Sequence, residues 1–477
     1  MRARILADEN RKWLTLAAVS FGLFMIMLDN TIVNVALPSI QSSLGLKVSE
    51  LEWVVTGYAL TFGALMLTGG KLADLFGRRR IFIVGLVIFT GASLACGLAS
   101  SPSLLIGARV VQGAGSALMN PATLSIITAT FPPRQRGMAI GIWAGVAAMA
   151  LAIGPLVGGL ITQHIGWNWI FFINVPVGIL AIVVTRLVVD ESRDTSANQR
   201  LDLPGLLSSA IALFALTYGL IEANTYGWTS GRILGLFAVA VVGLIIFVAL
   251  ELRQRTPMLD LSLFKNGTFA GANAVMLLVG LAMFGVFFYN SLFIQNIMGY
   301  SAVQTGATFL PMTMLIILVA PVAGKFSDQV GSRWLMGGGM ILLSASLFLF
   351  SRLDAGSNFW DLFPGLIVGG FGMALVMTPT TAAAMGSVAV DKAGVGSAVL
   401  NSMRQVGGSL GIAVMGAIVA SAIHSQPGTP QAAAEFVTGF QHALIVASII
   451  ALAGAFLSVA TVRKYRHLEA PTAEAAA

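Results

Sequence analysis

The sequence predicts an all-α polytopic membrane protein with about fourteen transmembrane helices. Its 477 residues are 57% hydrophobic and only 10% charged, whereas a soluble domain carries about 25% charged residues. Long apolar stretches follow one another along nearly the whole chain, and the Lys and Arg residues gather in every second loop between them. This composition excludes a soluble globular protein.

Each predicted helix is an apolar stretch of about 20 residues, the length that crosses the hydrocarbon core of a bilayer. In chain order the stretches lie near 13–36, 51–75, 81–99, 102–130, 137–162, 168–189, 203–222, 232–252, 268–294, 303–327, 333–351, 361–386, 394–423 and 438–462. The first is longer than the apolar region of a signal peptide, and no A-x-A cleavage site follows it, so we expect it to be retained.

The basic residues predict the orientation in the membrane. One set of alternating loops holds most of them, including Arg78, Arg134 and both terminal segments, whereas the opposite loops hold only Lys47, Arg232 and Arg352. Lys and Arg are retained on the cytoplasmic side of a membrane. We therefore expect a multi-pass protein of the bacterial inner membrane with both termini in the cytoplasm.

An internal repeat divides the chain. GKLADLFGRRR at 70–80 recurs as GKFSDQVGSR at 324–333, each between two predicted helices. We expect an N-terminal bundle at 1–189, a cytoplasmic linker at 190–202, two inserted helices at 203–252, a C-terminal bundle at 253–462 and a cytoplasmic tail at 463–477. Repeated bundles around a site at the membrane midplane are the usual build of secondary transporters.

Two ionisable residues lie deep in predicted helices. Asp29 interrupts the first apolar stretch within LDNTIVNVALP, and Arg109 lies well inside the fourth. A charge at membrane depth costs about 2.5 to 3.5 kcal/mol on insertion scales, so such residues are functional candidates and need partners. Arg109 stays protonated and cannot carry a proton, but it can act on a carboxylate that does. Asp29 is its candidate partner and the candidate proton carrier.

The predicted fifth helix is rich in glycine. Gly137, Gly141 and Gly145 recur every four residues, a spacing that lets helix backbones touch. Further along the same helix lies the motif GPLVGG at 154–159, where Pro155 interrupts the backbone hydrogen bonds and predicts a kink.

These motifs together resemble one family along essentially the whole chain. LDNTIVNVALP, GKLADLFGRRR, RVVQGAGSA at 109–117, GPLVGG and WNWIFFINVPVG at 167–178 occur in the expected order on the expected helices. The chain resembles a major facilitator superfamily transporter of the fourteen-helix drug:proton antiporter branch. The resemblance implies a major facilitator fold of two six-helix bundles plus two inserted helices.

The resemblance also implies roles for particular residues. Asp29 and Arg109 would couple transport to protons, and GPLVGG would be the antiporter motif with Gly154, Pro155, Gly158 and Gly159. The repeated loop would be a conformational switch that latches the bundles in one state, with Gly70, Asp74, Gly77, Arg78 and Arg79 in the first copy and Asp328, Gly331 and Arg333 in the second. Candidates for the substrate cavity are Asn34, Gln112, Glu222, Phe284, Phe288, Asn401 and Arg404.

Other classes of protein lack their signatures. The one G-x-S-x-G match, at 407–411, lies inside a predicted membrane helix and not at the strand-to-helix turn that a hydrolase needs, and no H-E-x-x-H motif occurs. No Walker loop indicates an ATP-driven pump, and the single Cys96 with four scattered His residues gives no metal site. We expect no cofactor except protons as the coupling ion, no nucleic-acid partner, and a monomer in the lipid bilayer.

The sequence therefore predicts a proton-coupled antiporter that exports small lipophilic, cationic compounds, as in multidrug efflux. Two alternatives stay open: an exporter of a specific metabolite, lipid or self-made antibiotic, and an uncoupled facilitator. A facilitator would not need the buried carboxylate of Asp29.

Overall fold

The computed structural model describes residues 8–193, 202–254, 257, 259–388, 393–426 and 428–462. The described residues form helices and no strands. The N-terminal bundle consists of α2 (Asp8–Leu44), α3 (Val48–Phe76), α4 (Arg78–Gly97), α5 (Pro102–Thr130), α6 (Pro133–His164), α7 (Trp169–Phe172) and α8 (Asn174–Val188).

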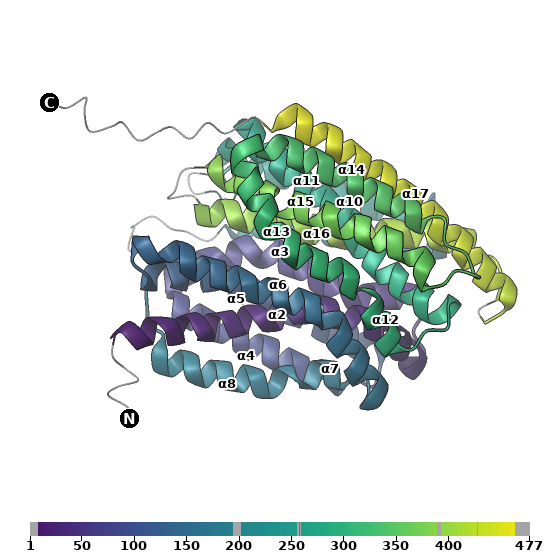
Figure 1. The fold of residues 1–477 in the computed structure, drawn as a ribbon, viewed down its shortest axis with the longest axis horizontal. Coiled ribbons are helices and arrows are strands. Elements are labelled where there is room, and N and C mark those ends of the chain that lie inside the picture. Colours follow the sequence, from purple (N-terminus) through teal and green to yellow (C-terminus); the bar gives the residue numbers. More distant parts are fainter. Residues whose placement is uncertain are drawn as a thin grey trace.

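The C-terminal bundle follows the two inserted helices α9 (Leu203–Tyr226) and α10 (Gly231–Arg253). It consists of η1 (Leu261–Lys265), α11 (Gly267–Leu292), the π-helical segment η2 (Phe293–Ile297), α12 (Ala302–Thr308), α13 (Leu310–Val330), α14 (Ser332–Phe350), α15 (Phe359–Gly386), α16 (Ala393–Ala422) and α17 (Pro430–Thr461). Figure 1 shows the two bundles side by side, with α2 beginning and α17 ending at the same end of the helix stack. We call this the terminal end and the opposite one the distal end.

The predicted fold class is confirmed, and the number of membrane-length apolar helices differs from the predicted number of spans by one. In the described part of the chain, 13 helices are long and apolar enough to cross a membrane. The remaining predicted span, α5, is 29 residues long but is less apolar because it carries Arg109, Gln112 and Asn120. It lies against α3 and α4, and all three of these polar residues are buried in protein rather than exposed to lipid.

Two predicted spans are interrupted. The sixth is divided at Ile173 between α7 and α8, and the tenth at Phe309 between α12 and α13. Pro311 follows the second break at the start of α13, where the missing N–H of proline interrupts the helical hydrogen bonds. The short helix α12 lies against α6 of the other bundle.

The bundles are joined by hydrogen bonds toward their distal ends. Ser291 Oγ of α11 donates to the carbonyl of Asn34 at 2.6 Å, and Gln295 Nε2 of η2 donates to the carbonyl of Val35 at 2.9 Å. The amide of Val303 donates to Gln163 Oε1 at 3.1 Å. Near mid-height, Ser402 Oγ of α16 donates to the carbonyl of Gly63 in α3 at 2.6 Å.

The glycines of GPLVGG lie in this junction. A Cβ at Gly159 would clash with the carbonyl of Ala302 in α12, and a Cβ at Gly306 of α12 would clash with the carbonyl of Pro155. A Cβ at Gly158 would lie 2.7 Å from the carbonyl oxygen of Ile32 in α2. The motif therefore brings α6 into backbone contact with both α2 and α12.

The other glycine series in α6 behaves differently. A Cβ at Gly141 or Gly145 would meet nothing within 4 Å, so the close helix contact predicted from their spacing is wrong. Gly141 and Gly145 are exposed, and the spacing alone does not identify which glycines touch a neighbour.

We expect Gly159→Ala to force α6 and α12 apart at the distal end. An added methyl group against backbone costs about 1 to 3 kcal/mol, enough to shift the population toward a distally open form. Distances between spin labels on the distal ends of α6 and α12 in the purified protein would report the shift. Gly145→Ala is the matched control and should leave the distances unchanged; equal distances in both variants would contradict the role assigned to Gly159.

Candidate functional site

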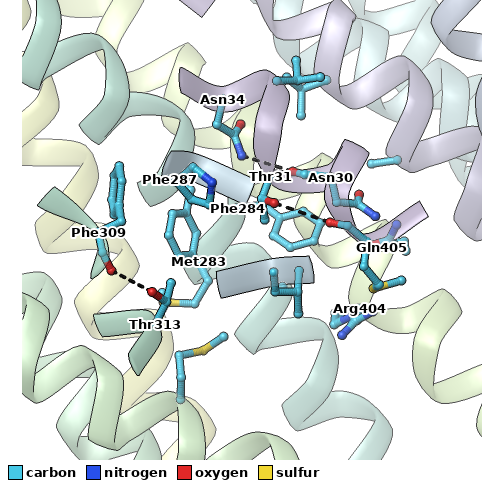
Figure 2. A pocket seen from close by; sticks show the side chains of 18 of the residues that line it. Asn30, Thr31, Asn34, Met283, Phe284, Phe287, Phe309, Thr313, Arg404 and Gln405 are labelled. Atoms are coloured by element: carbon cyan, nitrogen blue, oxygen red, sulfur yellow. Dashed lines mark hydrogen bonds between the residues drawn. The ribbon is translucent and has the colours of Figure 1, made fainter. Parts of the chain in front are cut away.

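A cavity lies between the two bundles. Its volume is about 110 Å³, smaller than the roughly 300 to 1,000 Å³ of a typical ligand pocket, so a drug-sized compound would need the walls to move apart. Its walls come from α2, α3, α5 and α6 of one bundle and from α11, α13, α15 and α16 of the other. Figure 2 shows Arg404 and Gln405 on one side of the cavity and Phe309 with Thr313 on the opposite side.

A buried ion pair lies behind the α5 wall of this cavity. Arg109 Nη1 donates to Asp29 Oδ2 at 2.5 Å, and the two side chains are 1% and 0% exposed. Gln112 connects to both, because its Nε2 donates to Asp29 Oδ1 at 2.9 Å and its Oε1 accepts from Arg109 Nη1 at 2.7 Å. The sequence-based pairing of Asp29 with Arg109 thus corresponds to a direct contact.

Arg109 is further fixed by its surroundings. Its Nε donates to the carbonyl of Val54 at 2.9 Å, and its guanidinium carbon lies 4.2 Å from the ring centroid of Tyr58. Arg109 and Tyr58 line the cavity, whereas Asp29 does not. The arginine therefore separates the carboxylate from the space where a compound would bind.

The structure brings only some of the predicted cavity residues together. Asn34, Phe284 and Arg404 line the cavity. Gln112 does not, because it is buried beside Asp29. Phe287 and Gln405, sequence neighbours of the predicted Phe288 and Arg404, are also part of the wall.

Three other cavity predictions are wrong. Glu222 is on the inserted helix α9, which packs outside the cavity against α3 and α16. Phe288 is fully buried with its ring centroid 4.9 Å from that of Tyr289. Asn401 directs its amide to the carbonyl of Ser397 in its own helix at 3.0 Å and is absent from the cavity wall.

The sequence missed a second buried acid. Glu52, near the distal start of α3, is 3% exposed, and Tyr289 of α11 donates its hydroxyl hydrogen to Glu52 Oε1 at 2.6 Å. Glu52 Oε2 has no hydrogen-bond partner among the described residues, and Gly416 of α16 packs directly against the carboxyl group. The acid therefore lies in the junction between the bundles, where three helices meet.

The first copy of the repeated loop makes its contacts within the N-terminal bundle. Arg78 Nε and Nη2 both donate to Asp74 Oδ1 at 3.0 Å, and the backbone N–H of Arg79 donates to Glu191 Oε1 at 3.1 Å. Gly77, with a φ of 108°, lies close to the Glu191 carboxylate, so a side chain there would disturb this contact. Gly70 packs against Pro121 of α5.

The second copy is held by different groups. Ser327 and Ser332 hydrogen-bond to one another at 2.7 Å, and Gly331 adopts a φ of 95°. Arg333 stacks near Trp334, with 5.2 Å from the guanidinium carbon to the ring centroid. The side chain of Asp328 lies outside the described residues.

Residues 19–412 match the sequence profile of the Major Facilitator Superfamily. The chain belongs to this superfamily. It is 38% identical to the tetracenomycin C resistance and export protein of Streptomyces glaucescens, over 87% of this chain and 77% of that protein. It is 38% identical to the multidrug resistance protein Stp of Mycobacterium tuberculosis, over 86% and 76% of the two chains, and 35% identical to the puromycin resistance protein pur8 of Streptomyces alboniger, over 93% and 89%.

The fold agrees with solved members of the major facilitator type. A bacterial homologue of the human lysosomal transporter Spinster, in an inward-facing and unoccupied conformation, superposes with a TM-score of 0.69 at 17% identity, over 97% of this chain and 100% of that one. An auto-inhibited peptide transporter of the POT family gives a TM-score of 0.70 at 16% identity, over 97% and 98%. The resemblance inferred from the motifs is thus confirmed: this is a multi-pass membrane protein of a transporter superfamily.

We expect Tyr289→Phe to weaken the distal junction of this superfamily member. The change removes the only described hydrogen bond to the buried Glu52 carboxyl, a loss of about 1 to 3 kcal/mol, and nothing else in the side chain. The measurement is the distance between spin labels on the distal ends of α3 and α11, which should increase in part of the population. Phe288→Leu, beside it but without a hydroxyl, is the control; unchanged distances in Tyr289→Phe would show that the contact does not hold the junction.

Proposed function

We propose that the chain is a proton-coupled antiporter that exports small lipophilic compounds by alternating access. The observation that carries this proposal is the ion pair of Asp29 and Arg109, buried directly behind the wall of the inter-bundle cavity. Protonation of Asp29 would leave the Arg109 charge without its counter-charge, so the proton changes the electrostatics of the cavity wall. The relatives named for resistance and export support the outward direction of transport.

The cycle follows from the junction. In the bacterial inner membrane with cytoplasmic termini, the distal end would face outward, and the described conformation is joined at that end. A compound from the cytoplasmic side would enter the cavity, and opening of the distal junction would release it outside. The substrate, a proton and the lipid bilayer are the partners of such a carrier, and a monomer contains the whole cavity.

The cavity wall bears on the charge of the substrate. The sequence suggested cationic compounds, but the described residues that line the cavity include no Asp or Glu. The proposed function therefore includes no preference for cations. The alternative of an uncoupled facilitator differs from it in that transport would not depend on the proton gradient.

We expect Asp29→Asn to abolish gradient-driven efflux. It also leaves the buried Arg109 charge uncompensated, at a cost of about 3 to 5 kcal/mol in stability, so loss of transport alone would be ambiguous. The double variant Asp29→Asn/Arg109→Gln removes both charges and should regain most of the thermal stability without regaining gradient-driven transport. Transport is measured in everted membrane vesicles with and without a proton gradient, using anionic, neutral and cationic fluorescent compounds.

Asp190→Asn is the matched control for this experiment. Asp190 forms an exposed ion pair with Arg11, which contributes about 0 to 1 kcal/mol, so both stability and efflux should remain. Wild-type transport that ignores the proton gradient would identify a facilitator. Concentrative efflux by the double variant would place the coupling proton elsewhere, with Glu52 the next acid to test.

We also propose that the loop around Asp74 and Arg78 is a conformational switch. In the described conformation Asp74 bonds to Arg78 within its own bundle, and its role in the other conformation would be to hold the cytoplasmic ends of the bundles together. Asp74→Asn should then slow turnover while substrate binding persists, with about 1.4 kcal/mol corresponding to a tenfold shift in population. Binding and transport are compared on the same purified variant.

Arg80→Gln is the control for the switch, because the Arg80 side chain is 63% exposed and lies 3.6 Å from Glu191. Its turnover should match that of the wild type. Normal turnover in Asp74→Asn would contradict the switch and leave Asp74 as a residue that only stabilises the loop.

A further inference from the structure

The cavity wall carries one positive charge without a counter-charge. Its two cations are Arg109 and Arg404, and the described lining includes no acid. Arg109 is paired with Asp29 at 2.5 Å. Arg404, near the middle of α16, makes no ion pair or hydrogen bond with any described residue, and its Nε is buried without a partner.

Most other polar groups in the wall already make a hydrogen bond within the protein. The amides of Asn30 and Asn34 donate to the carbonyls of Ile26 and Asn30 at 2.9 and 3.2 Å. The hydroxyls of Thr31 and Thr313 donate to carbonyls of their own helices, and the Tyr58 hydroxyl bonds to Ser116. These side chains are therefore at least partly satisfied within the protein, although each Asn amide keeps a second N–H that these bonds do not use.

Gln405 is the exception beside Arg404. It is 1% exposed, yet both its Nε2 and its Oε1 lack a hydrogen-bond partner among the described residues. Such an unpaired polar group costs about 1 to 3 kcal/mol unless something completes it. Figure 2 shows the two neighbouring side chains together on one side of the cavity. Arg404 and Gln405, the lining residues whose buried polar atoms lack partners among the described residues, thus lie next to one another.

The rest of the wall is apolar and aromatic. Phe287 and Phe309 have ring centroids 5.4 Å apart, and Met283, Phe284 and Met377 extend the same surface. Aromatic and methionine side chains adapt to flat hydrophobic ligands of different shapes. One end of the cavity therefore favours an apolar ring system, and the other a hydrogen-bond acceptor.

We propose that the transported compounds are aromatic or other flat lipophilic molecules that carry an acceptor group, a carboxylate, a sulfonate or a carbonyl, bound by Arg404 and Gln405. The planar guanidinium matches such groups with two parallel N–H donors. The same unpaired charge repels a permanent cation, so the site selects against lipophilic cations. This inference rests on the proposed export function and gives the specificity of that same cavity.

The test uses three fluorescent compounds with one dimethylaminonaphthalene body, which carries a sulfonate, a neutral sulfonamide or a quaternary ammonium group. Binding is measured on the full-length protein in lipid nanodiscs, with empty nanodiscs subtracted. We expect the sulfonate to bind at least tenfold more tightly than the ammonium compound, with the sulfonamide in between. Arg404→Gln should reduce sulfonate affinity at least tenfold and reduce sulfonamide affinity by less, with about 1.4 kcal/mol for each factor of ten. It should tighten binding of the ammonium compound, which no longer meets an unpaired positive charge.

Two further variants make the result specific. Arg404→Lys keeps the charge without the planar fork and should retain part of the sulfonate preference, and it replaces Arg404→Gln if that variant is unstable. Arg352→Gln removes an exposed arginine that does not line the cavity and should change nothing. Tighter binding of the ammonium compound than of the sulfonate to the wild-type protein, or an Arg404→Gln variant with unchanged selectivity, would overturn the inference.

The efflux assay separates this inference from the proposed function. Gradient-driven export of the ammonium compound alone would support the transporter and contradict the selectivity. If the sulfonate binds but none of the three compounds is exported, the binding site is supported and the export function is contradicted. Failure of all three compounds to bind would contradict both.

Discussion

The ion pair between Arg109 and Asp29 is the constraint on which the N-terminal bundle depends. Both charges are buried at membrane depth, so each needs the other, and removing one leaves an uncompensated charge worth about 3 to 5 kcal/mol. The pair requires α2 and α5 to meet at one height, with α3 supplying the Val54 carbonyl and the Tyr58 ring. It also explains why α5 is enclosed by protein, since a helix that carries these groups cannot face lipid with them. Arg109 then becomes part of the cavity wall, which connects a structural necessity to the site of transport.

The junction between the bundles uses a different set of interactions. Its described contacts are backbone to backbone at Gly159 and Gly306, together with a few neutral hydrogen bonds and the Glu52 to Tyr289 contact. The ion pairs found among the described residues lie within the N-terminal bundle or join it to Asp190 and Glu191 at the start of the linker, and none of these pairs crosses between the bundles. Small individual energies suit a surface that must open and close in every cycle, whereas a buried ion pair across it would hold one state too strongly. The stronger interactions are thus kept inside the rigid unit, and the weaker ones between the units.

The sequence could predict the properties that depend on neighbouring residues in the chain, and could not predict those that depend on how the helices pack. Apolar length identifies the spans, and a charge within one, such as Asp29, is visible against an apolar background. Glu52 is not visible in this way, because an acid near the start of a helix, two residues after Glu50, also occurs where a helix begins in solvent. Phe287 and Phe288 differ by one position in α11, yet only the first faces the cavity, and the choice is made by helix packing. Gly145 and Gly159 look alike in the sequence and differ only in whether α12 lies opposite.

A substrate bound through Arg404 sets a condition on coupling. If Asp29 takes up a proton, Arg109 stays in the wall, held by Val54 and Tyr58, and adds its positive charge to the cavity. The added positive charge would repel a bound cation but attract a bound anion, so protonation of Asp29 does not by itself release a compound held by Arg404. Exchange would then require that the junction opens and closes only when the carrier holds either the compound or the proton. Gly159, Tyr289 and Glu52 lie at that junction. When an empty carrier closes it, the Arg404 charge stays buried and unpaired, which costs free energy. A bound acceptor group pairs with this charge and removes that cost. For such compounds, the specificity of the cavity and the closure of the bundles are therefore two effects of one buried charge.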